Sequence, residues 1–493
     1  MDHGCFCCEK YREVFGEKMK KRIAGMVLGG AMILGLTGCG EKKILDPAHP
    51  AVISVWHYYN GAQQDAFDSL VEEFNNTKGK EEGIYVEAFS YGTVTDLIDN
   101  VVASIDGKAG AEELPNIFAS YVDTALQVDQ RGYVASLDSY FTQEELEKYV
   151  DGYLGEGRFS SDGSLKIIPV AKSVELMMLN KTDWDIFSAA TGTDIAELDT
   201  MEGLCRIAQQ YYEWTDASTP QPDDGKAFFG RDAMANYMLI GYRQLGEEMF
   251  SVEDGKVTLH FDRDAVKSLW DAYYIPYVKG YFTSEGRFRS DDVKTGAILC
   301  CVASSSSATY FPKEVILSDE ESYPIEMITM PCPKFENGGD YAVQQGAGML
   351  VTKAEEKEQL ASVEFLKWLT QDEQNIRFSS SSGYLPVTKS ANQEASADVQ
   401  EDIPDCVKKA LESGKETVRE NEMYFTKAFE GSSDCRTLLE TVLQEAAVRD
   451  RQTVEERLTG GMTLEDAVEE FCQEEYFDSW YQETKNKLEA LLR

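Results

Sequence analysis

The sequence predicts an α/β protein with two large domains, and three observations support this. The 455 residues from Cys39 to Arg493 exceed what one hydrophobic core usually organises. Segments with strand and helix patterns alternate along most of that length, as in a parallel sheet covered by helices. From about Ile403 the chain is charged and has helical periodicity, which predicts additional helices at its C-terminal end.

The apolar run near the N-terminus predicts a secretory signal peptide. In KMKKRIAGMVLGGAMILGLTGCGEKK, residues 18–43, a basic cluster is followed by an apolar stretch from Ile23 to Leu34. That stretch is shorter than the roughly 20 residues that a transmembrane helix needs. We predict a signal peptide at 1–38 and a tether at 39–50. Because Met19 directly precedes the basic cluster, residues 1–18 are interpreted as a mis-assigned start.

The residues LTGC, which end at Cys39, resemble a bacterial lipobox. The resemblance implies that Cys39 becomes the first residue after cleavage and carries a diacylglycerol thioether with acyl chains such as palmitate. Two or three acyl chains hold a protein at a membrane surface without spanning it. We therefore expect a lipoprotein on the extracellular face of the cell membrane. An ordinary signal peptide with a chance cysteine is the alternative.

Net charge excludes some partners. Without residues 1–38 the counts of Lys+Arg and Asp+Glu fall from 47 and 87 to 41 and 83, a net charge of −42. Such an acidic chain disfavours nucleic acid as a partner, because nucleic acid is a polyanion.

The cysteines and histidines are dispersed, and the cluster of His3, Cys5, Cys7 and Cys8 lies in the predicted leader, so we predict no metal and no cofactor.

Strands and helices are expected in alternation from residue 51 onward. AVISVWHYY (51–59) has the pattern of a buried strand, and apolar residues recur at helical spacing in the next segment (62–76). Further strands are predicted in the segments 83–91, 114–120, 164–180, 295–308 and 346–353, with a helix at 94–107.

Four stretches, in this order, resemble the extracellular solute-binding proteins of ABC importers, in the branch that carries sugars and glycerol phosphates. They are ISVWHYYNGAQQDAFDSLVEEFNN (53–76), RGYVASLDSYF (131–141), SVEFLKWLTQDEQNIRFSSSSGYLPVTKSA (362–391) and LTGGMTLEDAVEEF (458–471). The third, with its GYLPV turn, is the most specific.

This resemblance implies a fold like that of type II periplasmic binding proteins: two α/β lobes with a hinge, an interlobe ligand cleft and extra C-terminal helices. By family position, lobe 1 comprises 51–168 and 303–349, and lobe 2 comprises 169–302 and 350–493. The implied partners are a small ligand and the permease subunits of an ABC importer, and a monomer is expected.

Loops that follow the strands supply candidate ligand contacts. Aromatic faces stack on sugar rings while amides and phenols bond hydroxyl groups, so Tyr58, Tyr59 and Asn60 suit a carbohydrate. Family position adds Thr93, Tyr121 and Asp123, although Asp123 as a plain surface carboxylate is the alternative. The remaining candidates are Ser306 and Ser307 after a strand, Gln345 and Gly346, and Tyr384 in the GYLP turn. For the serines, a simple polar turn is the alternative.

An uncharged mono- or oligosaccharide is the preferred ligand. Glycerol 3-phosphate or a glycerophosphodiester is the alternative, but the late arginine of that branch has no counterpart in the sequence except Lys427. A secreted glycosidase, which needs two paired carboxylates, is a further alternative. Since the chain contains none of the common catalytic motifs, we predict a binding protein and not an enzyme.

Overall fold

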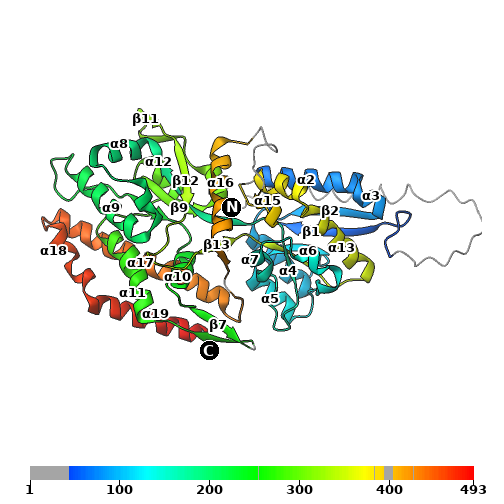
Figure 1. Ribbon diagram of the computed structural model, residues 1–493. Coiled ribbons are helices and arrows are strands. Elements are labelled where there is room, and N and C mark those ends of the chain that lie inside the picture. The colour runs from blue at the N-terminus through cyan, green and yellow to red at the C-terminus, as the bar shows by residue number, and fades with distance from the viewer. Residues whose placement is uncertain (1–43, 254, 382, 394–402, 426) are drawn as a thin grey trace, which may run out of the picture. The chain divides into compact units, whose positions relative to one another are not determined.

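Two β-sheets, each with helices around it, organise the part of the chain that the structure describes (Figure 1). This computed structural model describes residues 44–493 except 254, 382, 394–402 and 426. The predicted signal peptide and Cys39 lie outside the described residues. Within the described part, no helix combines the length and the apolar character that crossing a membrane requires.

The first sheet has the strand order β2-β1-β3-β14-β4. β1 pairs in parallel with β2 and β3, whereas β14 is antiparallel to both β3 and β4. Its strands are β1 (Ala51–His57), β2 (Ile84–Ser90), β3 (Ile117–Ser120), β14 (Gly348–Val351) and β4 (Ile167–Pro169). The helices that accompany it are α2 (Gly61–Asn76), α3 (Lys78–Glu82), α4 (Val94–Ile105), α5 (Val122–Gln130), α6 (Gln143–Leu146), α7 (Asp151–Glu156), α13 (Glu356–Leu369), α14 (Asp372–Ser380) and α15 (Lys389–Gln393).

The second sheet has the order β15-β13-β5-β9-β6, and β12 also pairs with β5. Its strands are β15 (Glu422–Tyr424), β13 (Tyr341–Gln345), β5 (Ser173–Asn180), β9 (Cys300–Ser304), β6 (Phe229–Arg231) and β12 (Met327–Pro331). Two hairpins add β7 (Phe250–Glu253) with β8 (Lys256–Leu259), and β10 (Glu314–Ser318) with β11 (Glu321–Pro324).

A second set of helices accompanies the second sheet, and most of them lie around it in Figure 1. The set comprises α8 (Lys181–Thr191), α9 (Met201–Asp216), α10 (Met234–Gln244), α11 (Arg263–Val278), α12 (Arg289–Thr295), α16 (Asp405–Glu420), α17 (Ser432–Thr459), α18 (Leu464–Val468) and α19 (Glu474–Leu491). Short 3-10 helices are η2 (Asp138–Tyr140), η3 (Ile195–Asp199), η4 (Ser305–Tyr310) and η6 (Glu469–Cys472). α17 packs on α10 and α11, so the predicted C-terminal helices are confirmed.

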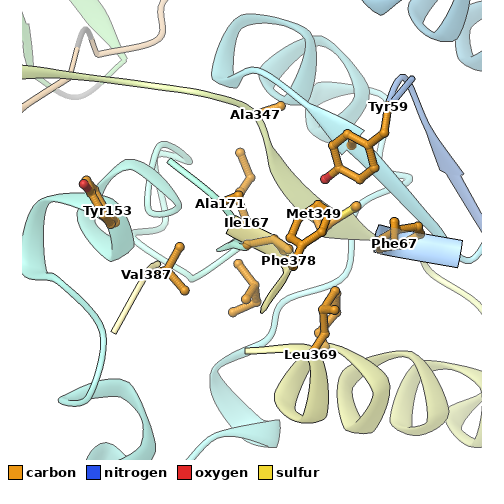
Figure 2. Packing of buried hydrophobic residues seen from close by; sticks show 14 of the residues in the cluster. Tyr59, Phe67, Tyr153, Ile167, Ala171, Ala347, Met349, Leu369, Phe378 and Val387 are labelled. Carbon is orange, nitrogen blue, oxygen red and sulfur yellow. The ribbon is translucent and has the colours of Figure 1, made fainter. Parts of the chain in front are cut away.

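The spacing of apolar residues along the sequence explains why β1 and α2 form and which side chains they bury. On α2, Phe67, Leu70 and Phe74 are buried at the spacing of one helix face, and this face packs on β2 and α14. Figure 2 shows Phe67 in the same buried cluster as Tyr59, Met349 and Phe378. The ring of Tyr59 lies 5.2 Å from both Phe67 and Phe378, measured between centroids.

Between these two sheets, consecutive strands change sheet three times: from β4 to β5, from β13 to β14 and from β14 to β15. The first two passages are short, because residues 170–172 join β4 to β5 and residues 346–347 join β13 to β14, whereas the third includes several helices. β12 and β13, which fall within 303–349, pair with β5 of the second sheet. The predicted lobe boundaries stay a prediction.

His57, at the end of β1, makes the stability of the fold sensitive to acid. Its side chain is 1% exposed, and burial lowers the pKa of His57 from 6.5 to about 4. Below pH 6.5 the unfolded chain takes up a proton here that the folded chain does not, so stability falls as the pH decreases towards 4. The loss reaches about 3 kcal/mol in total.

We therefore expect His57→Phe to reduce the slope of unfolding free energy against pH between 6.5 and 4.5 by about 1 kcal/mol per pH unit at most. Denaturant titrations at several pH values measure this slope. His49→Gln is the matched control, because the side chain of His49 is 83% exposed. Equal slopes for wild type and His57→Phe would contradict the assignment.

Candidate functional site

A cavity of about 570 Å³, which we call the central cavity, is lined by segments associated with both sheets. The start of α5, the end of α7, the end of β13, the β9–η4 junction and the first turn of α17 all contribute. The lining residues are Ile98, Tyr121, Val122, Asp123, Thr124, Glu156, Ser173, Asn236, Ser304, Ser306, Val343, Gln344, Gln345, Gly346, Tyr384, Phe425, Ser432, Ser433 and Arg436.

Six of the eleven predicted ligand contacts lie together in this lining. They are Tyr121, Asp123, Ser306, Gln345, Gly346 and Tyr384. These residues are up to 263 positions apart in the sequence, from Tyr121 to Tyr384, and come from four separate segments. Their convergence makes the central cavity the candidate functional site, while their role in binding stays a prediction.

Glutamine side chains at the end of β13 are the most unusual polar groups of the cavity. Gln344 is 5% exposed, yet neither its Nε2 nor its Oε1 has a hydrogen-bond partner among the described residues. The Oε1 atom of Gln345 is likewise buried and without a partner in this part of the chain. Buried polar atoms are nearly always paired, so these carboxamide atoms are exceptions whose missing hydrogen bonds a ligand in the cavity could supply.

Gly346 is required where β13 turns towards the first sheet. Its φ is +99°, and a Cβ atom there would lie 3.0 Å from the carbonyl oxygen of Ala171 and 3.5 Å from the ring of Tyr384. The missing side chain therefore lets three segments approach one another beside the cavity.

A buried lysine fixes this approach. Lys172 is 1% exposed, donates to the carbonyl of Gly346 at 2.6 Å and forms an ion pair with Glu156. Its backbone also pairs with Leu385, which follows Tyr384. The ammonium group of Lys172 thus neutralises the carboxylate of Glu156, which lines the cavity.

The other charged groups of the cavity also have protein partners. Asp123 accepts a hydrogen bond from the Ser432 hydroxyl at the start of α17. Arg436, one turn further along α17, donates to the Oδ1 atom of Asn236, and Asn236 donates to Glu175 at 2.9 Å. Glu175 in turn forms a buried ion pair with Arg231. This chain of contacts holds the Arg436 guanidinium in place.

Tyrosine hydroxyls supply neutral donors. Burial raises the pKa of Tyr384 to about 12, and a hydrogen bond between Tyr384 and Ser306 links the GYLP turn to η4. Burial also raises the pKa of Tyr121, while a hydrogen bond from Tyr58 partly offsets that rise. At neutral pH both phenols are therefore protonated.

The remaining predicted contacts lie elsewhere. Tyr58 is hydrogen-bonded to Tyr121 but does not line the cavity, and Tyr59 is 4% exposed within the core. Asn60 bonds the carbonyl of Gly92 at 3.3 Å, and Thr93 caps α4 by accepting from the backbone of Asp96. Ser307 lines a neighbouring cavity. The role in ligand binding of these five residues stays a prediction.

Sequence reasoning missed several lining residues, above all Gln344, Asn236, Glu156 and Arg436. Arg436, rather than Lys427, is the late cation of the cavity. A signal for it existed: GSS before RTLLETVLQEAAV is a typical helix start, and the first turn of a helix attracts polar ligands. No group of three His, Cys, Asp or Glu suited to a metal occurs among the described residues.

Comparisons with known proteins agree with this architecture. The model of a family described as bacterial extracellular solute-binding protein matches residues 69–404. No curated protein matches the sequence.

Several solved structures share the fold. A cyclic α-maltosyl-1,6-maltose binding protein from Arthrobacter globiformis is 19% identical, with a TM-score of 0.63 over 90% of this chain and 99% of that chain. A Mycobacterium tuberculosis protein in complex with glycerophosphocholine is 16% identical, with a TM-score of 0.63 over 90% and 98%. The acarbose-binding GacH receptor of Streptomyces glaucescens is 14% identical, with a TM-score of 0.61 over 90% and 98%. At these identities the likeness shows the fold, and the predicted periplasmic-binding-protein-like α/β class is confirmed.

The close approach at Gly346 can be tested by substitution. Gly346→Ala forces a side chain into positive φ and places its Cβ against the backbone of Ala171, so we expect it to lower the free energy of unfolding by about 1 to 3 kcal/mol. Gly92→Ala is the matched control, since φ there is +75° but nothing lies within 4 Å of a Cβ. Chemical denaturation of both variants measures the difference, and equal losses would show that the contact with Ala171 is unimportant.

Proposed function

The chain belongs to the family of bacterial extracellular solute-binding proteins, and we propose that it captures an uncharged carbohydrate in the central cavity and delivers it to the permease of an ABC importer. Membership of the family confirms the resemblance predicted from the sequence. Capture is non-covalent, so the protein acts as a binding protein and not as an enzyme.

The free carboxamides at the end of β13 carry this proposal. Each sugar hydroxyl can both donate and accept a hydrogen bond, and a carboxamide offers two donors and an acceptor in one plane. Gln344 brings both functions to the cavity wall without a protein partner among the described residues, and Gln345 adds an acceptor. A ligand rich in hydroxyl groups satisfies these atoms.

Aromatic side chains complete the chemistry. Tyr121, Tyr384 and Phe425 line the same cavity as the two glutamines. Tyr121 is 41% exposed, which leaves part of its surface available to the apolar face of a sugar ring. Aromatic surface combined with a few placed polar groups is typical of a small-molecule site.

Electrostatics also favour an uncharged ligand. Asp123, Glu156 and Arg436 each already have a protein partner, namely Ser432, Lys172 and Asn236. An anion placed beside Arg436 would also meet the two carboxylates of the lining, whose repulsion opposes its binding.

A glycerophosphodiester is the second candidate, and the first turn of α17 favours it. Ser432, Ser433 and Arg436 bring a guanidinium and the N-terminal end of a 28-residue helix to the cavity, and both features attract phosphate. The similar structure with bound glycerophosphocholine supports this candidate. Asp123 weighs against it, because its carboxylate already bonds Ser432 at that helix end.

Ligand capture would work through closure of two lobes, one around each sheet, with residues 170–172 and 346–347 as hinge segments. Segments associated with both sheets line the cavity, so a ligand there contacts both lobes. A ligand favours closure only by the difference between its affinities for the open and closed states. The closed monomer would then dock on the permease.

Membrane attachment is the remaining part of the proposed function. Residues 1–38 direct secretion, Cys39 receives the lipid, and residues 39–50 form the tether on the extracellular face of the membrane. The supporting observations are the basic cluster, the short apolar run and the LTGC residues.

If a carbohydrate binds in the central cavity, removing the carboxamide of Gln344 should lower the affinity for it. We expect Gln344→Leu to weaken binding of the best ligand from a panel of mono- and oligosaccharides by about tenfold, since one or two hydrogen bonds are lost. Titration calorimetry on the Cys39→Ser chain without residues 1–38 measures this change. Gln130→Leu, at an exposed end of α5, is the matched control.

Arg436→Gln separates the two candidate ligands in the same assay. If an uncharged sugar is the ligand, glycerophosphocholine shows no measurable binding to the wild-type chain. Binding of glycerophosphocholine that Arg436→Gln abolishes, together with no binding of any sugar, would replace the first candidate by the second.

If Cys39 carries the lipid, replacing it should move the protein from the membrane fraction to the soluble fraction. In bacterial cells the full chain should incorporate labelled palmitate and sediment with membranes, whereas Cys39→Ser should remain unlabelled and be released. Cys472→Ser, at an exposed cysteine near the C-terminal end, is the control. Equal labelling of wild type and Cys39→Ser would contradict the assignment.

A further inference from the structure

A cavity of about 730 Å³, which we call the second cavity, lies where β9, η4 and α12 meet. α12 packs on both β9 and β10, and both strands contribute to the lining. None of the residues that line it lines the central cavity. Its volume is typical of sites for small molecules. The second cavity is therefore a candidate site for a separate ligand.

The most buried part of its lining is apolar apart from one carboxylate. Met178 of β5 and Cys301 of β9 are paired across the sheet, and both are buried. Ala303, two residues further along β9, faces the same cavity. Asp232 follows β6, where its backbone N–H bonds the carbonyl of Val302 at 2.9 Å, and its side chain is 28% exposed. The cavity thus combines an apolar surface with a largely buried carboxylate.

The carboxylate of Asp232 is only weakly partnered. It lies 3.5 Å from the Nε atom of Arg289 and has no other ion pair with the part of the chain that the structure describes. The guanidinium of Arg289 also forms a buried ion pair with Asp292. Burial raises the pKa of Asp232, so Arg289 compensates only in part for the water that the carboxylate has lost. A cation in the cavity would supply further compensation.

The other charged groups of the lining balance one another. Lys294 and Lys313 are opposed by Asp291 and Glu314, and all four side chains are exposed. Water and salt screen exposed charges of this kind, so their effect on a bound ligand is small. The charge that matters most to a ligand inside the cavity is that of Asp232.

Two aromatic rings that line the second cavity are exposed. Phe288 is 53% exposed and Tyr310 is 75% exposed, so neither ring serves the hydrophobic core. The backbone N–H of Phe288 donates to Asp291 at 3.0 Å, which holds this residue at the start of α12. Its ring already attracts one cation, since the guanidinium of Arg287 lies 5.2 Å from the ring centre. Aromatic faces attract apolar groups and cations alike.

We propose that the second cavity binds an organic ammonium ion with an apolar or aromatic body, at a site separate from the central cavity. The ammonium group pairs with Asp232, and the body of the ligand packs against Phe288 and Tyr310. This inference goes beyond the proposed function, because it holds whichever ligand occupies the central cavity.

Three probes with one aromatic ring and different charges test this site. Benzylammonium, benzyl alcohol and benzoate are titrated by calorimetry into the chain that lacks residues 1–38 and carries Cys39→Ser. We expect benzylammonium to bind about tenfold more tightly than benzyl alcohol, because only the cation can pair with Asp232. Benzoate should not bind, because its carboxylate would be repelled by that of Asp232.

Substitutions separate the roles of charge and ring. In Asp232→Asn we expect the affinity for benzylammonium to fall to that for benzyl alcohol, while benzyl alcohol binds as before. Asp319→Asn, at an exposed carboxylate between β10 and β11, is the matched control. The double variant Phe288→Ala and Tyr310→Ala should weaken both probes, and it changes only exposed side chains. Its control is Tyr85→Ala with Phe89→Ala, which removes two exposed rings of β2.

The outcomes distinguish this site from the central cavity. Absence of benzylammonium binding, equal affinities for the three probes, or a preference for the cation that Asp232→Asn leaves intact would overturn the proposal. Benzylammonium binding that is lost in Gln344→Leu instead would place the probe in the central cavity and overturn it as well. None of these results bears on the sugar titrations, so the proposed function stands or falls separately. Loss of charge selectivity in Asp232→Asn, together with weaker binding of both probes in the aromatic variant, supports the site.

Discussion

The buried ammonium group of Lys172 is the interaction on which the site depends. It lies in the passage from β4 to β5, where it bonds the carbonyl of Gly346 in the returning passage and pairs with Glu156 of α7. A buried cation is tolerated only when such partners surround it, and removing one partner typically costs about 3 to 5 kcal/mol. Lys172 therefore ties both short passages to the wall of the central cavity, and the positions of Gln345, Gly346 and Tyr384 follow from it.

Local partners, rather than the net charge of −40, decide what the cavity can bind. Arg436 is held by Asn236, which Glu175 and Arg231 orient from within the core. Because these charged groups already have protein partners, they shape the cavity and orient its lining more than they attract a charged ligand. The carboxamide of Gln344 is the opposite case, since it is buried and uncharged but has no partner among the described residues. The proposed specificity for hydroxyl groups rests on this contrast.

Local sequence patterns predicted the early elements well, because periodicity alone identifies a buried strand or helix face. β1, α2 and the helical C-terminal end agree with the structure. Tyr121, Ser306 and Tyr384 line one cavity, while their role in ligand binding stays a prediction. The rest depends on tertiary contacts. Ser306 and Ser307 diverge because η4 turns successive side chains apart by about 120°. Arg436 was missed because its helix pattern shows which face is buried, not which end meets a cavity.

The direct bond between Asp123 of α5 and Ser432 of α17 has a consequence for closure. It joins a helix associated with the first sheet to one associated with the second, across the central cavity. If the lobes close as proposed, this contact stabilises the closed arrangement, and a ligand needs to add only the remaining free energy. If the ligand instead displaced Asp123 from the helix end, it would have to offset the lost bond as well. The proposed uncharged ligand would avoid that cost if it bonds both groups while they stay in place.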